Sequence, residues 1–338
     1  MKAYELKEMT GPTGLILNAE RPEPEAGHGE VKIKVHATSL NYRDLLVASG
    51  RYPAKTDSSL IPLSDGAGEV VAVGTGITRF KVGDRVAGTF FQGWSGGAIS
   101  AEFTARALGG AVDGMLAEYV VLREDGVIHT PDYLSYEEAA TLPCAGLTAW
   151  NAVVESGRIR AGETVLLLGT GGVSLFALQF AKLQGAHVVI TSSNDEKLAR
   201  AKALGADTLI NYRSTPDWEK EVVKATGGRG VDLVVEVGGG GTLERSIKSV
   251  RVGGTIAIIG VVAGPGQVEP RTIIAKAARL QGIFVGSGEM FTAMNRAVTQ
   301  AALKPVIGRT FTFDEARLAY EYQAGGSHFG KIVIKVAD

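Results

Sequence analysis

The sequence of 338 residues predicts an α/β fold, in which a doubly wound parallel sheet is accompanied by a second, β-rich domain. Three observations support this prediction. Segments near the N-terminus alternate apolar and polar residues, as half-buried strands do. From about residue 135, aliphatic runs alternate with helical patterns, and the run at 165–168 ends in closely spaced glycines. A chain of this length exceeds the usual size of one domain, so we expect two domains.

The N-terminal part is predicted to contain strands at residues 30–37, 69–74 and 116–122, with a turn and a further strand within 80–86. A long glycine-rich segment, 88–114, is predicted to be an irregular loop, a type of segment that often carries function. Its aromatic residues, Phe90, Phe91 and Trp94, either cap an apolar pocket or pack against their own domain.

The remainder of the chain is predicted to alternate strands and helices. A capping box from Ser135 to Glu138 opens one helix, and residues 147–155 form a second. Six strands are expected, at 164–168, 187–191, 208–211, 231–236, 255–261 and 281–285. Helices at 294–302 and 313–322 precede a last strand at 331–336, which we expect to rejoin the N-terminal part. The expected domains are therefore 1–125 with 300–338, and 126–299.

The glycine-rich turn after residue 168 is typical of a dinucleotide-binding crossover. Gly169 permits the sharp turn, and Gly171 lets the backbone approach a pyrophosphate without a Cβ atom in the way. Backbone amides at the start of the next helix, among Thr170, Gly172 and Val173, are expected to face the phosphates. Ser174 replaces the third glycine and is small enough for close helix–strand contact. The pattern predicts a nicotinamide cofactor and hydride chemistry.

Composition excludes several classes of partner. The formal net charge of −1 gives no indication of a nucleic-acid surface. The N-terminal charges argue against a secretory signal, and the longest uncharged run, 252–268, is too rich in glycine for a membrane span. The lone cysteine, Cys144, allows no internal disulfide, so we expect a cytoplasmic setting. The hydride chemistry predicted from the glycine turn implies a small-molecule substrate.

Several motifs together resemble the medium-chain dehydrogenase/reductase superfamily. The motifs are residues 62–70, 81–86 and 142–149. The order of the segments agrees as well: a β-rich domain, then a mid-chain glycine motif, then a returning C-terminal strand. Asn41-Tyr42-Arg43-Asp44, followed by 50–53, resembles the zinc-free quinone oxidoreductase branch. The resemblance implies a Rossmann domain, a GroES-like catalytic domain and a homodimer that extends its sheet through 255–262 and 280–286.

Metal binding is not expected. One cysteine cannot form the four-thiolate structural site of zinc-dependent members. Asp65-Gly66-Ala67-Gly68-Glu69 stands where their metal-binding Gly-His-Glu is found. We expect His36 and Cys144 to pack within the fold.

The cofactor is predicted to be NADP(H). The second crossover strand is followed by Ser192 and Ser193 and not by the carboxylate that would repel a 2′-phosphate. Ser193 either caps the next helix, contacts the phosphate, or does both. Lys197 and Tyr212 resemble the lysine and tyrosine that hold the 2′-phosphate in NADPH-using quinone oxidoreductases.

Further cofactor contacts are expected at the carboxyl ends of later strands, where open α/β sheets bind ligands. These candidates are Val237, Gly238, Gly260, Val261, Gly286 and Ser287. The resemblance adds Thr148 and a C-terminal segment that includes His328, Phe329 and Lys331. Each of these residues either contacts the cofactor or serves the fold.

Without zinc, reduction of an activated double bond or a quinone is the simplest chemistry, because the substrate oxygen then needs only a hydrogen-bond donor. Asn41, Tyr42 and Tyr52 are the predicted catalytic residues, with a tyrosine or water as proton donor; the tyrosines otherwise line an aromatic cleft. Arg43 and Asp44 are expected to form a local ion pair. Two alternatives stay open: an alcohol dehydrogenase, and a cofactor-binding scaffold with little turnover.

Overall fold

The computed structural model describes residues 1–54, 59–260, 262, 264 and 266–337. The chain divides into two compact units: unit 1 contains residues 1–147 and 286–338, and unit 2 contains residues 148–285. The boundaries therefore differ from the expected 125/126 and 299/300. Residues 126–147 belong to unit 1 because strand β7 (Val127–His129) pairs with strand β5 (Arg85–Gly88). Helix α10 (Gly288–Gln300) is held there as well, since Asn295 Nδ2 donates to the His129 carbonyl at 2.9 Å.

Unit 2 contains the predicted six-stranded doubly wound sheet, with strand order β10-β9-β8-β11-β12-β13 and every pair parallel. Its strands are β8 (Thr164–Leu168), β9 (His187–Ser192), β10 (Thr208–Asn211), β11 (Val231–Glu236), β12 (Val250–Ile258) and β13 (Arg279–Gly282). The prediction is thus confirmed, although the last two strands end earlier than expected.

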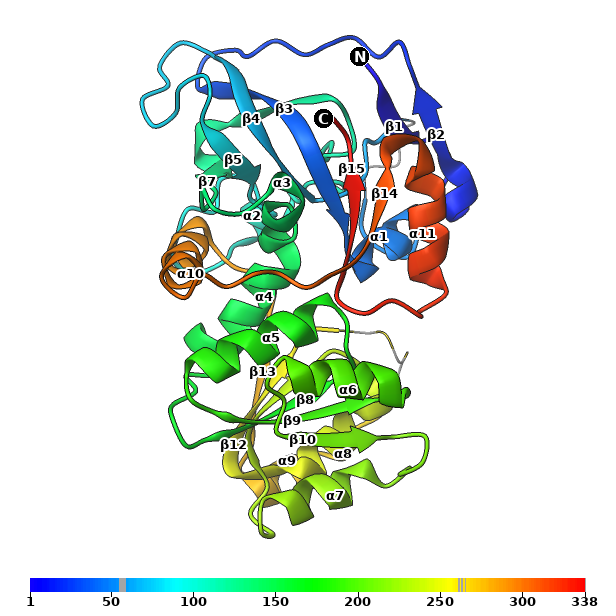
Figure 1. Cartoon of the computed structure of the whole chain (residues 1–338), viewed down its shortest axis with the longest axis vertical. Coiled ribbons are helices and arrows are strands. Elements are labelled where there is room, and N and C mark those ends of the chain that lie inside the picture. The colour runs from blue at the N-terminus through cyan, green and yellow to red at the C-terminus, as the bar shows by residue number, and fades with distance from the viewer. Residues whose placement is uncertain (55–58, 261, 263, 265, 338) are drawn as a thin grey trace. The chain divides into compact units, whose positions relative to one another are not determined.

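The helices of unit 2 cover both faces of this sheet. Helices α5 (Gly172–Leu183) and α6 (Asp195–Ala203) lie on one face, and α7 (Trp218–Ala225), α8 (Gly240–Ser249) and α9 (Pro270–Lys276) lie on the other (Figure 1). The expected helix 147–155 is a short α4 (Leu147–Trp150) followed by a π-helical turn (Asn151–Glu155). The central strands β8 and β11 are buried along their whole length because helices cover both faces of the sheet, which explains the aliphatic runs at 165–168 and 233–235.

Unit 1 is a β-rich domain with a seven-stranded sheet. The path is β14-β15-β3-β4-β5-β7, and β6 pairs with β3. Its remaining strands are β3 (Glu30–Leu40), β4 (Asp65–Val73), β6 (Tyr119–Arg123), β14 (Ile307–Thr312) and β15 (Lys331–Lys335). The predicted return of the C-terminal strand is confirmed, because β15 pairs antiparallel with β3.

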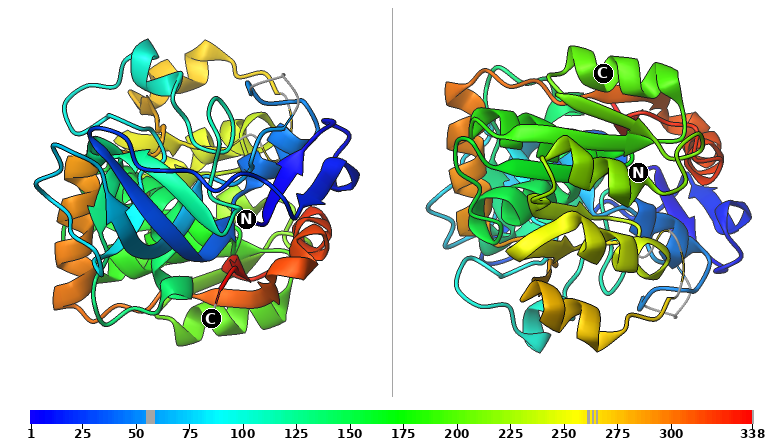
Figure 2. Two further views of the ribbon diagram at one scale, coloured as in Figure 1. Left: turned by 90° about the horizontal axis from the view of Figure 1, so that it is seen from above. Right: turned by 90° about the horizontal axis from the view of Figure 1, so that it is seen from below.

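Short helices and a separate two-stranded ribbon complete unit 1. The ribbon consists of β1 (Ala3–Leu6) and β2 (Leu15–Asn18) and lies beside helix α11 (Ala316–Ala324), as the views in Figures 1 and 2 agree. The other helices are α1 (Tyr42–Ala48), α2 (Ala101–Thr104) and α3 (Tyr136–Ala139), with a π-helical turn at Leu142–Gly146. Ser135 caps α3 as predicted, since its side chain accepts from the Glu138 backbone N–H.

The long loop 88–114 is irregular apart from α2, and its aromatic side chains serve packing. Phe90, Phe91 and Trp94 are all buried, and the Phe91 and Trp94 ring centroids lie 6.0 Å apart. The packing interpretation therefore holds for these three residues. In the part of the chain that the structure describes, no helix combines the length and apolarity needed to cross a bilayer.

Candidate functional site

The glycine turn of unit 2 has the backbone geometry of a phosphate-binding turn. Gly169 adopts φ +72°, a left-handed conformation that favours glycine. The first backbone hydrogen bond into α5 runs from Leu175 to the Gly171 carbonyl, so the preceding amides have no acceptor within the helix. Ser174 Oγ donates to the Leu168 carbonyl at 2.7 Å, which ties the helix to the strand. The turn therefore presents free amides and the positive end of a twelve-residue helix to an anion.

The end of β9 carries hydroxyl groups and no carboxylate. Ser192 is the last strand residue and is buried. The cap of α6 is Asn194, whose Oδ1 accepts from the Lys197 backbone N–H at 3.0 Å. The interpretation of Ser193 as the helix cap is therefore wrong, because the side chain of Asn194, one position later, accepts the hydrogen bond from the first turn of the helix. Ser193 is left as a candidate phosphate contact.

Lys197 and Tyr212 both follow the carboxyl ends of neighbouring strands, Lys197 in the helix after β9 and Tyr212 directly after β10. Tyr212 directly follows β10, and its backbone N–H donates to the Ser192 carbonyl at 3.0 Å. Lys197 lies in the first turn of α6, and its ammonium has no hydrogen bond or ion pair with any residue that the structure describes. Burial, together with the neighbouring Arg200, lowers the pKa of Lys197. A partly buried cation without a counter-ion is suited to bind an anionic ligand.

The loop after β11 is organised by a buried carboxylate that sequence reasoning missed. Glu236 Oε1 accepts from the Gly238 and Gly239 backbone N–H groups at 2.7 and 2.9 Å and from Thr242 Oγ1 at 2.6 Å. A Cβ atom on Gly260 would lie 1.8 Å from the Val237 carbonyl oxygen, so these two predicted cofactor residues are close neighbours. Val261 lies outside the described residues.

The other predicted cofactor residues make contacts within the protein that support its fold. Thr148 is buried on α4. Ser287 caps α10 through a 3.3 Å hydrogen bond from the Met290 backbone N–H, and Gly286 packs against Leu147. Phe329 is buried in unit 1, and His328 is half-buried beside it.

Unit 1 brings together a buried polar cluster where three adjacent strands meet. Register pairs Ile332 of β15 with Leu40 of β3, and Ser39 of β3 with Asp65 of β4. The start of β15, the end of β3 and the start of β4 therefore lie side by side. We call Asn41, Asp65 and Lys331 the three-strand cluster.

Within the three-strand cluster, Lys331 is the central cation. Its Nζ donates to the Leu40 carbonyl and to Asn41 Oδ1, each at 2.6 Å, and lies 3.6 Å from Asp65 Oδ2. Lys331 and Asp65 are 3% and 0% exposed, so the ion pair is inside the protein. The ammonium predicted to meet the cofactor is thus engaged by oxygens of its own unit. Asn41 Nδ2 is buried and has no hydrogen-bond partner among the described residues.

A second ion pair lies beside this cluster. Arg43 Nη1 lies 3.2 Å from Asp44 Oδ1, which confirms the expected pair, and also donates to the Leu108 carbonyl at 2.8 Å. The guanidinium lies over the rings of Tyr52 and Phe90, 5.0 Å from each centroid. Burial raises the pKa of Asp44 to about 6, against the opposing effect of Arg43.

The predicted catalytic tyrosines differ in environment. Tyr42 begins α1 and is 37% exposed, whereas Tyr52 packs against the apolar core of unit 1. Burial raises the pKa of Tyr52, so its phenol stays protonated at neutral pH. Cys144 is partly buried, with its thiol pKa also raised by burial, and His36 stacks on Tyr136 with centroids 4.2 Å apart.

No metal-ligand set is assembled in residues 1–54, 59–260 and 266–337, because no three His, Cys, Asp or Glu side chains gather there in a suitable group.

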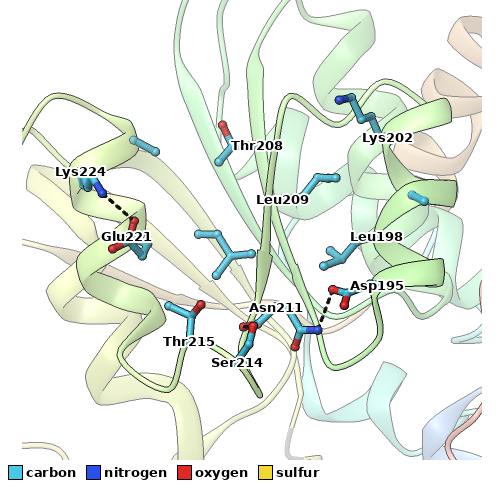
Figure 3. Close-up of a pocket in the computed structure, with 13 residues that line it drawn as sticks. Asp195, Leu198, Lys202, Thr208, Leu209, Asn211, Ser214, Thr215, Glu221 and Lys224 are labelled. Atoms are coloured by element: carbon cyan, nitrogen blue, oxygen red, sulfur yellow. Dashed lines mark hydrogen bonds and ion pairs between the residues drawn. The ribbon is translucent and has the colours of Figure 1, made fainter.

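A pocket of about 820 Å³ lies between α6, β10 and α7, with Asn211 Nδ2 donating to Asp195 at its rim (Figure 3). None of the glycine-turn residues lines it.

Comparison with known proteins covers both units. Residues 27–132 match the family model of the alcohol dehydrogenase GroES-like domain, and residues 172–300 match that of zinc-binding dehydrogenase. A zinc-type alcohol dehydrogenase-like protein of Schizosaccharomyces pombe is 45% identical over 91% of each chain. A quinone oxidoreductase of Homo sapiens is 29% identical, over 99% of this chain and 97% of that one. A solved NAD-dependent alcohol dehydrogenase, 36% identical, superposes with a TM-score of 0.92 over 100% of both chains.

Proposed function

Because the chain belongs to the medium-chain dehydrogenase/reductase superfamily, we propose that it reduces quinones or α,β-unsaturated carbonyl compounds with NADPH and without a catalytic zinc ion. Membership makes it an oxidoreductase of the nicotinamide-dependent type. The observation that carries the finer proposal is the buried, unpartnered amide of Asn41 beside a lysine–aspartate pair, in place of a group of metal ligands.

The residues of unit 2 fit NADP(H). A 2′-phosphate needs cationic or hydroxyl donors and no nearby free carboxylate. The donors are supplied by Ser192, Ser193, Lys197 and Tyr212. Of the two acidic residues in the first turn of α6, Asp195 accepts from Asn211 Nδ2 at 2.7 Å. One relative is named as NAD-dependent, so the choice of cofactor rests on these side chains of the chain itself.

The chemistry follows from the donors that unit 1 offers. When bound, reduced nicotinamide supplies a hydride to an activated carbon. The protein must then stabilise the negative charge that develops on the substrate oxygen, a task for a fixed hydrogen-bond donor. Asn41 Nδ2 is such a donor, and the protonated phenol of Tyr52, or a water molecule, delivers the proton.

A second candidate is interconversion of an alcohol and a carbonyl compound, favoured by the names of two of the relatives. Zinc-assisted catalysis of that reaction needs three protein ligands and an open position. The donor set of the three-strand cluster is an amide, a carboxylate and an ammonium, and the ammonium repels a cation. This set fits a metal ion poorly.

One assay separates the candidates. The purified chain is incubated with NADPH and an enone or a benzoquinone, and separately with NADP⁺ and the matching saturated alcohol, each with and without a chelator. We expect oxidation of NADPH in the first pair, unaffected by the chelator. Chelator-sensitive turnover of the alcohol alone would support the second candidate, and tight NADPH binding with no turnover would indicate a cofactor-binding scaffold.

The assembly and location are also proposals. We propose a cytoplasmic homodimer, in which the edge strand β13 of unit 2 meets its counterpart. In support, apolar side chains near this edge are strongly exposed, with Val252 at 65% and Ile274 at 75%.

A further inference from the structure

We propose that Lys331 is a positioning residue, whose ammonium fixes the Asn41 amide so that Nδ2 is presented to the substrate oxygen, with Asp65 holding the ammonium in place. This inference rests on the proposed function for the role of the substrate oxygen. The orientation of the amide itself follows from the geometry of unit 1 alone.

The chemistry of the contact determines which way the amide points. A lysine ammonium carries three donors and no acceptor, so the atom that faces it at 2.6 Å must be the Asn41 oxygen. The opposite atom, Nδ2, then has to point away from Lys331. It is buried and meets no acceptor in the described part of the chain. Buried donors without a partner are rare in proteins, and a ligand oxygen is the natural acceptor for this one.

The topology of unit 1 explains why these residues meet. Lys331 is the first residue of β15 and lies across from the end of β3, where Asn41 begins the turn into α1. Asp65 is the first residue of β4 on the other side of β3. Ser39 Oγ and Ser64 Oγ donate to its two oxygens at 3.2 and 2.8 Å, so the carboxylate is itself held in position.

Asn41 also has a rigid backbone. Its N–H donates to Asp44 Oδ2 at 2.7 Å, which fixes the entry into α1. A charged donor on Oδ1 further polarises the amide and strengthens Nδ2 as a donor, since hydrogen bonds in series reinforce one another. The lysine therefore acts on the substrate through the asparagine, without touching it.

The test is a double-mutant cycle between Lys331→Met and Asn41→Ala. Loss of a fixed donor to a developing oxyanion typically lowers kcat by about 10²- to 10³-fold, and we expect each single variant to fall in that range. KM for the quinone or enone and the dissociation constant for NADPH are expected to change little. If Lys331 acts through Asn41, the double variant is no slower than Asn41→Ala alone. Losses that multiply in the double variant would overturn the proposal.

Two further variants keep the test clear of folding effects. Lys331→Met leaves the buried Asp65 carboxylate without its counter-ion, so the variant Lys331→Met/Asp65→Asn is measured as well, in which both charges are removed together. It is expected to fold and to show the same fall in kcat. Lys335→Met, an exposed lysine on the same strand, is the matched control and is expected to retain wild-type kinetics.

A readout that needs no turnover separates this inference from the proposed function. Asparagine side-chain amides are labelled with nitrogen-15, and the Asn41 resonance is assigned by its loss in Asn41→Ala. We expect the Asn41 side-chain nitrogen and proton chemical shifts of the wild type to move in Lys331→Met/Asp65→Asn, because the charged donor on Oδ1 is lost, and the signals to broaden as the side chain samples other rotamers. An unchanged Asn41 signal would refute the positioning role, whatever the activity. Absence of turnover in the wild type, with the expected change in the signal, would refute the proposed function and leave the positioning role standing.

Discussion

Replacing Lys197 with methionine is expected to weaken NADPH binding and to spare NADH. The ammonium has no hydrogen bond or ion pair with the described residues, so its removal breaks no polar contact among them. A hydrogen bond to a charged group contributes about 1.5–3 kcal/mol, which corresponds to about a 10- to 150-fold change in affinity. Because the side chain is partly exposed, water screens the contact, and we expect the lower part of that range, about 10- to 30-fold.

The assay is a titration of the purified chain with each reduced coenzyme, followed by nicotinamide fluorescence. Lys202→Met is the matched control, because Lys202 lies on the same helix and is exposed. We expect this control to bind both coenzymes like the wild type. The NADPH affinity of the wild type should also fall with added salt more steeply than the NADH affinity, since the additional contact is ionic.

Two outcomes would refute this reasoning. An unchanged NADPH affinity in Lys197→Met would show that the lysine does not contact the 2′-phosphate. An equal loss for NADH and NADPH would show that the lysine supports the fold or another part of the nucleotide.

Three further predictions concern stability and assembly. The pKa of Asp44, raised by burial to about 6, means that the folded chain binds this proton more strongly than the unfolded chain, so stability falls by about 3 kcal/mol as pH rises from about 4 to 6. Urea unfolding of Asp44→Asn should lack this slope, and a slope equal to that of the wild type would contradict the assignment. In Gly169→Ala the added Cβ atom meets open space, but the backbone φ of +72° disfavours alanine. The free energy of unfolding should therefore fall by about 1–2 kcal/mol, and NADPH binding should weaken. Gly162→Ala is the matched control, because Gly162 has φ +85° and equally open space. It should lower the stability against thermal unfolding by the same amount and leave NADPH binding unchanged. An equal loss of NADPH affinity in both variants would contradict the role of the Gly169 turn in phosphate binding. Light scattering should show that Ile274→Lys converts the dimer to a monomer. Val82→Lys, which changes an exposed apolar residue of unit 1, should leave the dimer intact. A dimer in both variants would show that Ile274 is not in the interface.

The features that could be predicted from sequence are those that depend on local pattern. The aliphatic strands of unit 2 and the glycine turn at 169–172 follow from neighbouring residues, and all six strands were expected in parallel order. The return of the C-terminal strand to the N-terminal part was likewise expected, and the pairing of β15 with β3 confirms it.

The features that escaped prediction depend on contacts between distant segments. The unit boundaries moved because β7 and α10 join unit 1 through pairing and side-chain contacts that no local pattern reveals. Lys331 was expected at the cofactor, but its partners Asn41 and Asp65 lie about 270–290 positions away and meet it only through strand register. The role of Glu236 in ordering its loop is only weakly indicated by the sequence, where an acidic residue ends an apolar strand just before a run of glycines.

The most direct test of the account is a calorimetric titration of the purified chain with NADPH. We predict heat that saturates at one coenzyme per chain, with tighter binding than NADH. An absence of heat with either coenzyme, oxidised or reduced, would contradict the assignment of unit 2 as a nucleotide-binding domain and the function derived from it.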